Sequence, residues 1–451
     1  MTPLTDLSRR LAEGTLSARA LVEQCLERIA DPAGEGARAF ISVGAESARQ
    51  QADRVDQQRR AGKPLPPFAG IPFASKDLFD VVGEITCAGS RILADRPPAQ
   101  QDAPAIARLR GAGFIFVGRT NMTEFAYSGL GLNPHYGTPL CTFDRAARRI
   151  PGGSTSGGAV AVADGMAAAS LGTDTGGSCR IPAAFNGVVG FKPTASRVPR
   201  DGVVPLSHTL DSVGPLAASV ACCAALDEIL SGQERRDEPP VSLRGLRILV
   251  PTTLVLDDME PTVARAFERC VEHLAREGAT IAQQPLVEFQ RIPQINARGG
   301  LAAAEAYQWH REMLEQHAHR YDPRVAARIL KGREATAADI RELHDQRAAV
   351  IDVIDRETRD WDVLAMPTVP IIAPLLSAFE SDAEYTRLNV LVLRNPSLVN
   401  FLDRCAISLP IHDAAAPVGL MLVGARNGDS RLLRIAHAIE RALPTVSRTR
   451  P

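Results

Sequence analysis

Apolar and polar residues alternate along the chain with spacings that predict helices separated by strands. From Ser17, a candidate N-cap, apolar residues follow the i, i+3, i+4 pattern of an amphipathic helix, and residues 46–61 predict a second, more exposed helix. Short apolar runs predict two buried strands, one over Ile71–Ala74 that ends at Lys76 and one over Ile115–Val117.

The same alternation continues through the second half of the chain. Further helices are predicted over Ala103–Gly111, Pro261–Arg276, Ala302–His319, Ala337–Thr358 and Ser430–Ala442. Further strands are predicted over Leu246–Val250, Val363–Met366, Ala406–Leu409 and Val418–Val423. Such alternation favours a sheet with helices on both faces. Because no repeat or low-complexity linker divides the sequence, we predict one large α/β/α domain over residues 1–451, with a mixed, mostly parallel central sheet.

Composition and charge limit the classes of protein to which this chain can belong. The chain has 451 residues, of which 45% are hydrophobic and 23% charged, which is typical of a globular protein. Lys and Arg number 51 against 52 Asp and Glu, and no long block of like charge occurs, so a nucleic-acid partner is not expected. No apolar stretch reaches the roughly 18 residues of a membrane span, so we expect no membrane partner.

The N-terminus and the cysteines predict a cytoplasmic location. The chain opens with Asp6, Arg9, Arg10 and Glu13 instead of a basic stub and an apolar run, so we expect no secretory signal. The eight cysteines contain no C-x-x-C pair, which argues against a zinc ribbon or a redox dithiol and favours reduced thiols.

Residues 150–215 differ from the rest of the chain in their richness in glycine, serine and threonine. Two glycine-hydroxyl loops, Gly152–Gly158 and Gly172–Ser178, flank the apolar, helix-like run Ala159–Ala169. Paired glycines let the backbone approach a ligand closely and turn its N–H groups inward, as an oxyanion hole or an anion-binding nest requires. A phosphate cradle competes with this interpretation, but the chain lacks the G-x-x-x-x-G-K-[ST] pattern of a P-loop.

A serine nucleophile in these loops would need a base. The nine histidines do not identify one, neither loop has the G-x-S-x-G elbow of α/β-hydrolases, and His317 and His319 are two apart on a helix, a poor spacing for a metal pair. Lysine is the remaining candidate, and only four of the 51 cationic residues are lysines. Lys76 follows an apolar run, where a buried, neutral base could lie.

These residues resemble the amidase signature family. The resemblance rests on separate motifs in the family's order: Ile71–Asp77, Thr120–Ala126, Gly152–Gly158, Gly172–Thr194 and Gly202–Leu216. It extends from the first helix to the C-terminal strand and its helix, so it covers essentially the whole chain. Within it, residues of about 65–217 form the signature core, and helices of about 300–345 form a variable part of the substrate pocket.

The resemblance implies a Ser-cisSer-Lys triad of Lys76, Ser154 and Ser178. Lys76 would be the buried base, Ser154 the bridging serine after a cis peptide from Gly153, and Ser178 the nucleophile, 24 residues after Ser154 as the family spacing requires. Backbone N–H groups of Thr175, Gly176, Gly177 and Ser178 would bind the oxyanion. The acyl pocket would include residues 122–128, which begin with Met122.

Neighbouring residues are expected to be structural. We expect Cys179 to pack beside the nucleophile, Asp174 and Arg180 to hold the loop, and Lys192 to act as a structural cation. The sequence departs from the commonest family form at Ser156, where glycine is usual. Ser156 and residues 400–406 are similar to allophanate-hydrolase-like members, although those usually carry an extra C-terminal domain.

The resemblance therefore predicts a free-standing amidase. Such an enzyme converts a carboxamide to the acid and ammonia through an acyl-serine intermediate, with a small amide as its partner and no cofactor or metal. The alternatives are the glutamine-hydrolysing A subunit of a glutamyl-tRNA(Gln) amidotransferase-type complex, an allophanate or biuret-type hydrolase, and a scaffold that has lost the chemistry. A homodimer is expected at the level of the family.

Overall fold

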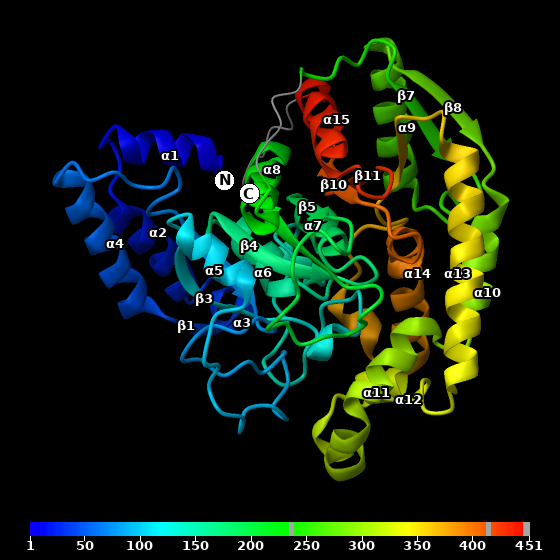
Figure 1. Ribbon diagram of the computed structural model, residues 1–451, viewed down its shortest axis with the longest axis horizontal. Helices are drawn as coiled ribbons and strands as arrows, with labels where there is room; N and C mark the ends of the chain where they lie inside the picture. The colour runs from blue at the N-terminus through cyan, green and yellow to red at the C-terminus, as the bar shows by residue number, and fades with distance from the viewer. Residues whose placement is uncertain (234–238, 412–415, 445–451) are drawn as a thin grey trace.

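An 11-stranded mixed sheet runs through the computed structural model, which describes residues 1–233, 239–411 and 416–444 (Figure 1). Across the sheet the strands follow the order β1-β3-β2-β4-β6-β5-β10-β11-β9-β7-β8. In chain order the strands are β1 Phe40–Val43, β2 Pro72–Lys76, β3 Ile115–Thr120, β4 Ala169–Asp174, β5 Val189–Lys192, β6 Ser212–Ala217, β7 Arg247–Pro251, β8 Thr280–Gln284, β9 Val363–Pro367, β10 Ala406–Pro410 and β11 Gly419–Val423. This arrangement confirms a single large α/β domain with a mixed sheet.

The expectation that the sheet is mostly parallel is wrong. Among the described strands, six of the ten pairings are antiparallel; the four parallel ones join β2 to β3 and β4, and β7 to β8 and β9. The predicted alternation assumed a helix between successive strands. Strands β10 and β11 are separated by only eight residues, too few for a crossover helix, and the residues between β5 and β6 form no helix; each pair is antiparallel.

Helices surround this sheet. They are α1 Leu4–Ala12, α2 Ala18–Ala30, α3 Gly36–Ala39, α4 Ala45–Arg60, α5 Pro104–Gly111, α6 Ser156–Ala163, α7 Arg180–Asn186, α8 Val220–Ser231, α9 Pro261–Arg276, α10 Arg291–Ile295, α11 Gly300–His317, α12 Pro323–Leu330, α13 Ala337–Thr358, α14 Asp382–Phe401 and α15 Asp429–Ala442. Ser17 is the predicted N-cap: its Oγ accepts the amide of Ala20 at 3.0 Å. Helices α9 and α13 have the predicted bounds.

The glycine-rich region differs from its prediction in one element. The helix-like run Ala159–Ala169 contains the end of α6, which stops at Ala163, and the first residue of β4. Gly165 follows the helix with φ +72°, a left-handed conformation that ends helices and that glycine adopts without strain. The chain can therefore turn directly from α6 into β4, which carries the second glycine loop.

Helix α14 was not predicted. It contains Pro396, and three asparagines on it, Asn389, Asn395 and Asn400, are buried. A helix that buries amides has no continuous apolar stripe, so the amphipathic pattern does not reveal it. In Figure 1 it lies to the left of α13, and its residues contact the second glycine loop, since a Cβ on Gly176 would meet Leu393 and Ser397.

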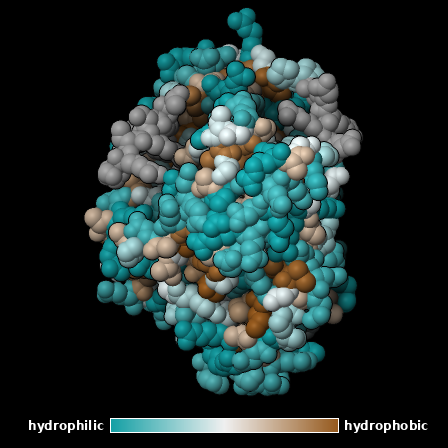
Figure 2. Space-filling view, turned by 90° about the vertical axis from the view of Figure 1, so that its left-hand side faces the viewer, coloured by the Kyte–Doolittle hydropathy of each residue, from teal (hydrophilic) through white to brown (hydrophobic). Residues whose placement is uncertain are grey.

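Polar residues cover much of the visible surface, and the thiols lie mostly beneath it. None of the helices in the described ranges is long and apolar enough to cross a lipid bilayer. Figure 2 shows the face on the side of α1, α2 and α4, which is mostly hydrophilic with small apolar patches. All eight cysteines are unpaired and all except Cys87 are buried.

Candidate active site

The three predicted triad residues come together at one edge of the sheet. Strands β2 and β4 are parallel neighbours, so their carboxyl ends lie at the same edge. Lys76 is the last residue of β2, and Ser178 lies in the loop that follows β4. The loop that carries Ser154 joins them, because the amide of Thr155 donates a hydrogen bond to the carbonyl oxygen of Ser178 at 3.2 Å.

Lys76 is fully buried and points at two hydroxyl groups. Its Nζ donates to Ser154 Oγ at 2.8 Å and to Thr173 Oγ1 at 2.9 Å. Burial lowers the pKa of Lys76 to about 8, although the Cys179 thiol and the carboxylates of Asp211 and Asp174 act in the opposite direction. Near neutral pH an appreciable fraction of this lysine is therefore the free amine, the form that can accept a proton.

The peptide bond between Gly153 and Ser154 is cis, as the family resemblance implied. The amide of Gly153 donates to the carbonyl of Gly129 at 2.8 Å, and a Cβ at Gly153 would lie 2.5 Å from the backbone nitrogen of Gly131. Only glycine fits this close approach of two backbones. The segment 129–131 therefore lies directly against the loop of Ser154.

The loop of Ser178 wraps around the carboxylate of Asp174. This carboxylate accepts the amides of Gly177 and Cys179 at 2.8 and 3.0 Å, and Arg180 at 2.8 and 3.0 Å. Burial by itself would raise the pKa of Asp174, but the charge and hydrogen bonds of Arg180 and a hydrogen bond from Asn400 hold it well below its usual range. These contacts place Asp174 and Arg180 as the structural pair that the sequence suggested.

The backbone amides of this loop differ in what they contact. The N–H groups of Thr175, Gly176 and Ser178 donate no hydrogen bond to any residue that the structure describes. The N–H of Gly177 is different, because it donates to Asp174. That hydrogen bond holds the loop, and the expectation that Gly177 also supplies an oxyanion donor stays a prediction.

Met122 is buried in the core beside the site. Its amide donates to its neighbour Asn121, and its carbonyl accepts a hydrogen bond from Asn133. The contact to the triad is made one residue later, where the amide of Thr123 donates to the carbonyl of Ser154 at 3.2 Å. A direct role for Met122 in binding substrate stays a prediction.

Sequence reasoning missed three polar residues of the site, Thr173, Asp211 and Asn400. Thr173 contacts Lys76, Asn400 donates to Asp174, and Asp211 accepts a hydrogen bond from Thr175. Thr173 lies in the motif Gly172–Thr194, and its position at the end of β4 is a signal that could have found it. Asp211 lies in the motif Gly202–Leu216 and Asn400 begins the family-like segment 400–406, but only the fold brings them to Thr175 and Asp174.

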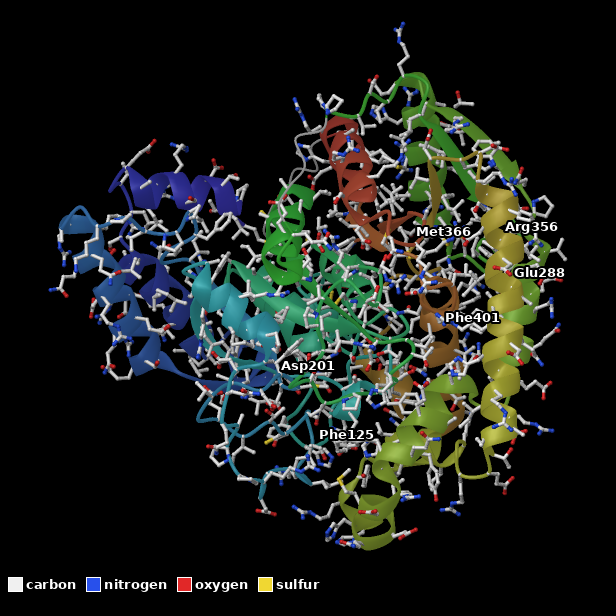
Figure 3. The ribbon with its side chains drawn as sticks, in the orientation of Figure 1. Phe125, Asp201, Glu288, Arg356, Met366 and Phe401 are labelled. Carbon is white, nitrogen blue, oxygen red and sulfur yellow. The ribbon has the colours of Figure 1, made fainter. Side chains whose placement is uncertain are left out.

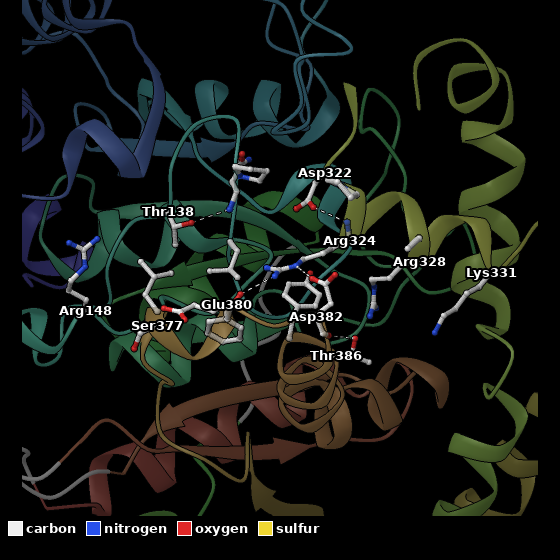
Figure 4. Close-up of a pocket in the computed structure, with 18 of the residues that line it drawn as sticks. Thr138, Arg148, Asp322, Arg324, Arg328, Lys331, Ser377, Glu380, Asp382 and Thr386 are labelled. Atoms are coloured by element: carbon white, nitrogen blue, oxygen red, sulfur yellow. Dashed lines mark hydrogen bonds and ion pairs between the residues drawn. The ribbon is translucent and has the colours of Figure 1, made fainter. Parts of the chain in front are cut away.

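A cavity of about 910 Å³ lies beside the segment that contacts Gly153 (Figure 4). It is lined by four residues of the segment 132–138, by Ala147 and Arg148, by α12, by the 3-10 helix η5 (Leu376–Phe379) and by the start of α14; the four are Leu132, Asn133, Pro134 and Thr138. Of the helices predicted between 300 and 345, α12 lines this cavity, whereas residues 122–128 do not. A place for either set in a substrate pocket stays a prediction.

Comparisons with known proteins bear on the family of the chain. The family model described as Amidase matches residues 20–433. The chain is 36% identical over 448 residues to a 2-amino-5-chloromuconic acid deaminase of Comamonas testosteroni, covering 97% of this chain and 95% of that protein. It is 34% identical to the A subunit of a glutamyl-tRNA(Gln) amidotransferase of Chloroflexus aggregans, covering 96% and 94%.

A solved structure shows the same fold. The crystal structure of an amidase superposes with a TM-score of 0.89 at 33% sequence identity, and the match covers 98% of this chain and all of the other. The family match spans most of the chain, and the relatives match along nearly their whole length. The chain therefore belongs to the amidase signature family of hydrolases.

Proposed function

We propose that this protein hydrolyses a small carboxamide to the carboxylic acid and ammonia through an acyl-Ser178 intermediate. The observation that carries the proposal is the contact of the buried Lys76 amine with Ser154 Oγ, on a loop that is hydrogen-bonded to Ser178. A buried amine with a lowered pKa can act as a general base at neutral pH.

Protons pass from Ser178 to Ser154 and from Ser154 to Lys76. Ser178 Oγ attacks the amide carbon and gives its proton to Ser154, while Ser154 gives its own proton to Lys76. When the tetrahedral intermediate collapses, the protons return along the same path to the leaving nitrogen, and ammonia departs. Water then attacks the acyl ester by the same route, which releases the acid and restores Ser178.

The free backbone amides supply the electrostatic part of the reaction. In this proposal the N–H groups of Thr175, Gly176 and Ser178 bind the negative oxygen of the tetrahedral intermediate. Such donors are fixed before the reaction begins, so little reorganisation is needed as the charge develops. Removal of one donor of this kind typically lowers the rate by about 100-fold or more.

A second candidate is the A subunit of an amidotransferase-type complex that releases ammonia from glutamine for a partner. The similarity to the corresponding chain of a glutamyl-tRNA(Gln) amidotransferase supports it. An allophanate or biuret-type hydrolase is a third candidate, which Ser156 and residues 400–406 support. Under the leading proposal the enzyme works on its own, as a cytoplasmic monomer or homodimer.

Ammonia release by the purified single chain tests the proposal. The panel contains short aliphatic amides, aryl acetamides, urea-like amides and glutamine. Ser178→Ala should abolish turnover, whereas Ser47→Ala, the same change at an exposed position on α4, should leave it unchanged. Activity on glutamine alone, or only in the presence of a second protein, would favour the second candidate. Turnover that survives in Ser178→Ala would exclude the acyl-Ser178 intermediate.

A further inference from the structure

Two arginines on helix α12 differ in their partners. Arg324 is paired, because its guanidinium donates to Asp382 at 2.8 Å and to the carbonyl of Phe379 at 2.9 Å. Arg328, one turn later, forms no ion pair with any described residue, and its buried Nε has no hydrogen-bond partner there. Its guanidinium lies over the ring of Tyr127, 4.6 Å from the centroid. Both arginines line the 910 Å³ cavity (Figure 4).

The stacking of Arg328 on Tyr127 brings its charge close to the catalytic loops. Tyr127 is followed by Ser128 and Gly129, and the carbonyl of Gly129 accepts the amide of Gly153. Phe125 of the same segment, labelled in Figure 3, packs against α11, because its ring centroid is 4.4 Å from that of His310. A short, fixed piece of backbone therefore separates Arg328 from the loop of Ser154.

A second hydrogen-bond donor without a partner lies against the same backbone segment. Asn389 is fully buried, and its Oδ1 accepts Ser128 Oγ and the amide of Gly129, both at 2.9 Å. Its Nδ2 has no partner among the described residues. Asn389 is one helical turn after Tyr385, which lines the cavity. Two donors without acceptors among the described residues thus lie beside the segment 127–129.

The charges around the cavity favour an anion. Arg148 and Lys331 also line it, and neither forms an ion pair in the described part of the chain. Three acidic residues are present as well. Asp382 is paired with Arg324, whereas Glu380 and Asp322, which accepts the amide of Arg324 at the start of α12, form no ion pair with any described residue. The lining therefore holds three unpaired cations, Arg148, Arg328 and Lys331, against two unpaired carboxylates.

We propose that this cavity binds the carboxylate of an amide substrate that carries a negative charge at the end of its acyl chain. Arg328 is the counterion, because a guanidinium stacked on an aromatic ring still offers N–H groups in the planar fork that matches a carboxylate. The inference rests on the proposed amide hydrolysis and adds its substrate class: monoamides of dicarboxylic acids in preference to neutral amides of the same length.

Matched substrates test this preference. Succinamate, glutaramate and adipamate are compared with butanamide, pentanamide and hexanamide, which differ only in the terminal carboxylate. The wild-type enzyme should have the higher kcat/KM for at least one anionic member. Arg328→Met should lower that value by about 10- to 100-fold, the usual effect of losing a charged hydrogen bond, and lower the value for the neutral partner far less. Arg333→Met, at an exposed position just beyond α12, is the matched control.

Binding without turnover separates this inference from the proposed reaction. Glutarate, a product of the series, should raise the melting temperature of Ser178→Ala, and should not do so when Arg328→Met is added. Equal losses for charged and neutral amides in Arg328→Met, a preference for the neutral series, or glutarate binding that survives the loss of Arg328 would each overturn the inference. Inorganic phosphate that binds as well as glutarate would also overturn it, because the cavity would then be a general anion site.

Discussion

The carboxylate of Asp211 accepts a hydrogen bond of 2.5 Å from Thr175 Oγ1. The same carboxylate accepts the amides of Leu206 and Ser207 at 3.0 and 3.1 Å. Helix α11 reinforces this segment, because Glu305 accepts hydrogen bonds from Ser207 and Thr209. Asp211 therefore joins the segment before β6 to the residue that begins the proposed oxyanion loop.

Asp211→Asn should lower kcat more than it changes KM. An amide keeps one acceptor but places an N–H group against a donor, so Thr175 loses its fixed orientation; we expect a fall in kcat of about 10- to 100-fold, typical of a lost charged hydrogen bond. Steady-state kinetics on the best amide measure this split. Asp201→Asn changes an exposed carboxylate of the same segment (Figure 3) and should behave as wild type. An unchanged kcat in Asp211→Asn would refute the role.

The pH profile of kcat/KM should rise through about pH 8. The base is the neutral amine of Lys76, whose pKa burial lowers to about 8, so activity increases as the proton leaves. Lys76→Ala should lose this activity at every pH. A rising limb close to 10.5, the ordinary pKa of lysine, would contradict the assignment of Lys76 as a desolvated base.

Thr173→Val should move that rising limb to lower pH. The hydroxyl of Thr173 accepts a hydrogen bond from Lys76 Nζ and stabilises the protonated amine; without it, the charged form is less favourable and the pKa of Lys76 falls. Thr173→Ser keeps the hydroxyl and should restore the wild-type profile. A limb that stays in place in Thr173→Val would show that the contact does not influence the proton.

Arg180→Met should destabilise the fold by about 3–5 kcal/mol. Both Arg180 and Asp174 are fully buried, and removal of one partner leaves a buried charge without compensation. Urea unfolding measures the change. The exposed pair Arg387 and Glu384 provides the comparison, since Arg387→Met should cost no more than about 1 kcal/mol. Equal effects in the two variants would contradict the structural role of the buried pair.

The family motifs predicted that Lys76 and Ser154 lie together, and the structure places Lys76 Nζ 2.8 Å from Ser154 Oγ. No local pattern singles out Ser154, because a serine in a glycine-rich loop is usually a turn residue. Asp211 and Asn400 also lie in segments that resemble the family, but their partners are 36 and 226 positions away, and no local pattern encodes such contacts. Their roles follow only from the fold.

Strand β6 and helix α14 also could not be predicted from the local sequence pattern. Strand β6 contains Gly214 and Pro215, residues that weaken strand propensity, and a Cβ at Gly214 would lie 2.0 Å from the carbonyl oxygen of Phe191. The close approach of two strands thus required glycine where a strand pattern expects a branched residue. Helix α14 could not be predicted from its apolar pattern, because several of its buried residues are polar asparagines.

The seven buried thiols make cysteine alkylation a measure of local unfolding in this protein. Burial raises the pKa of Cys25, Cys141 and Cys270 to about 12, so almost none of these sulfurs is a reactive thiolate at neutral pH. Alkylation of each one must wait until its part of the structure opens. The order in which the cysteines gain label, beginning with the half-exposed Cys87, therefore ranks the local stability of helices and loops along the whole chain.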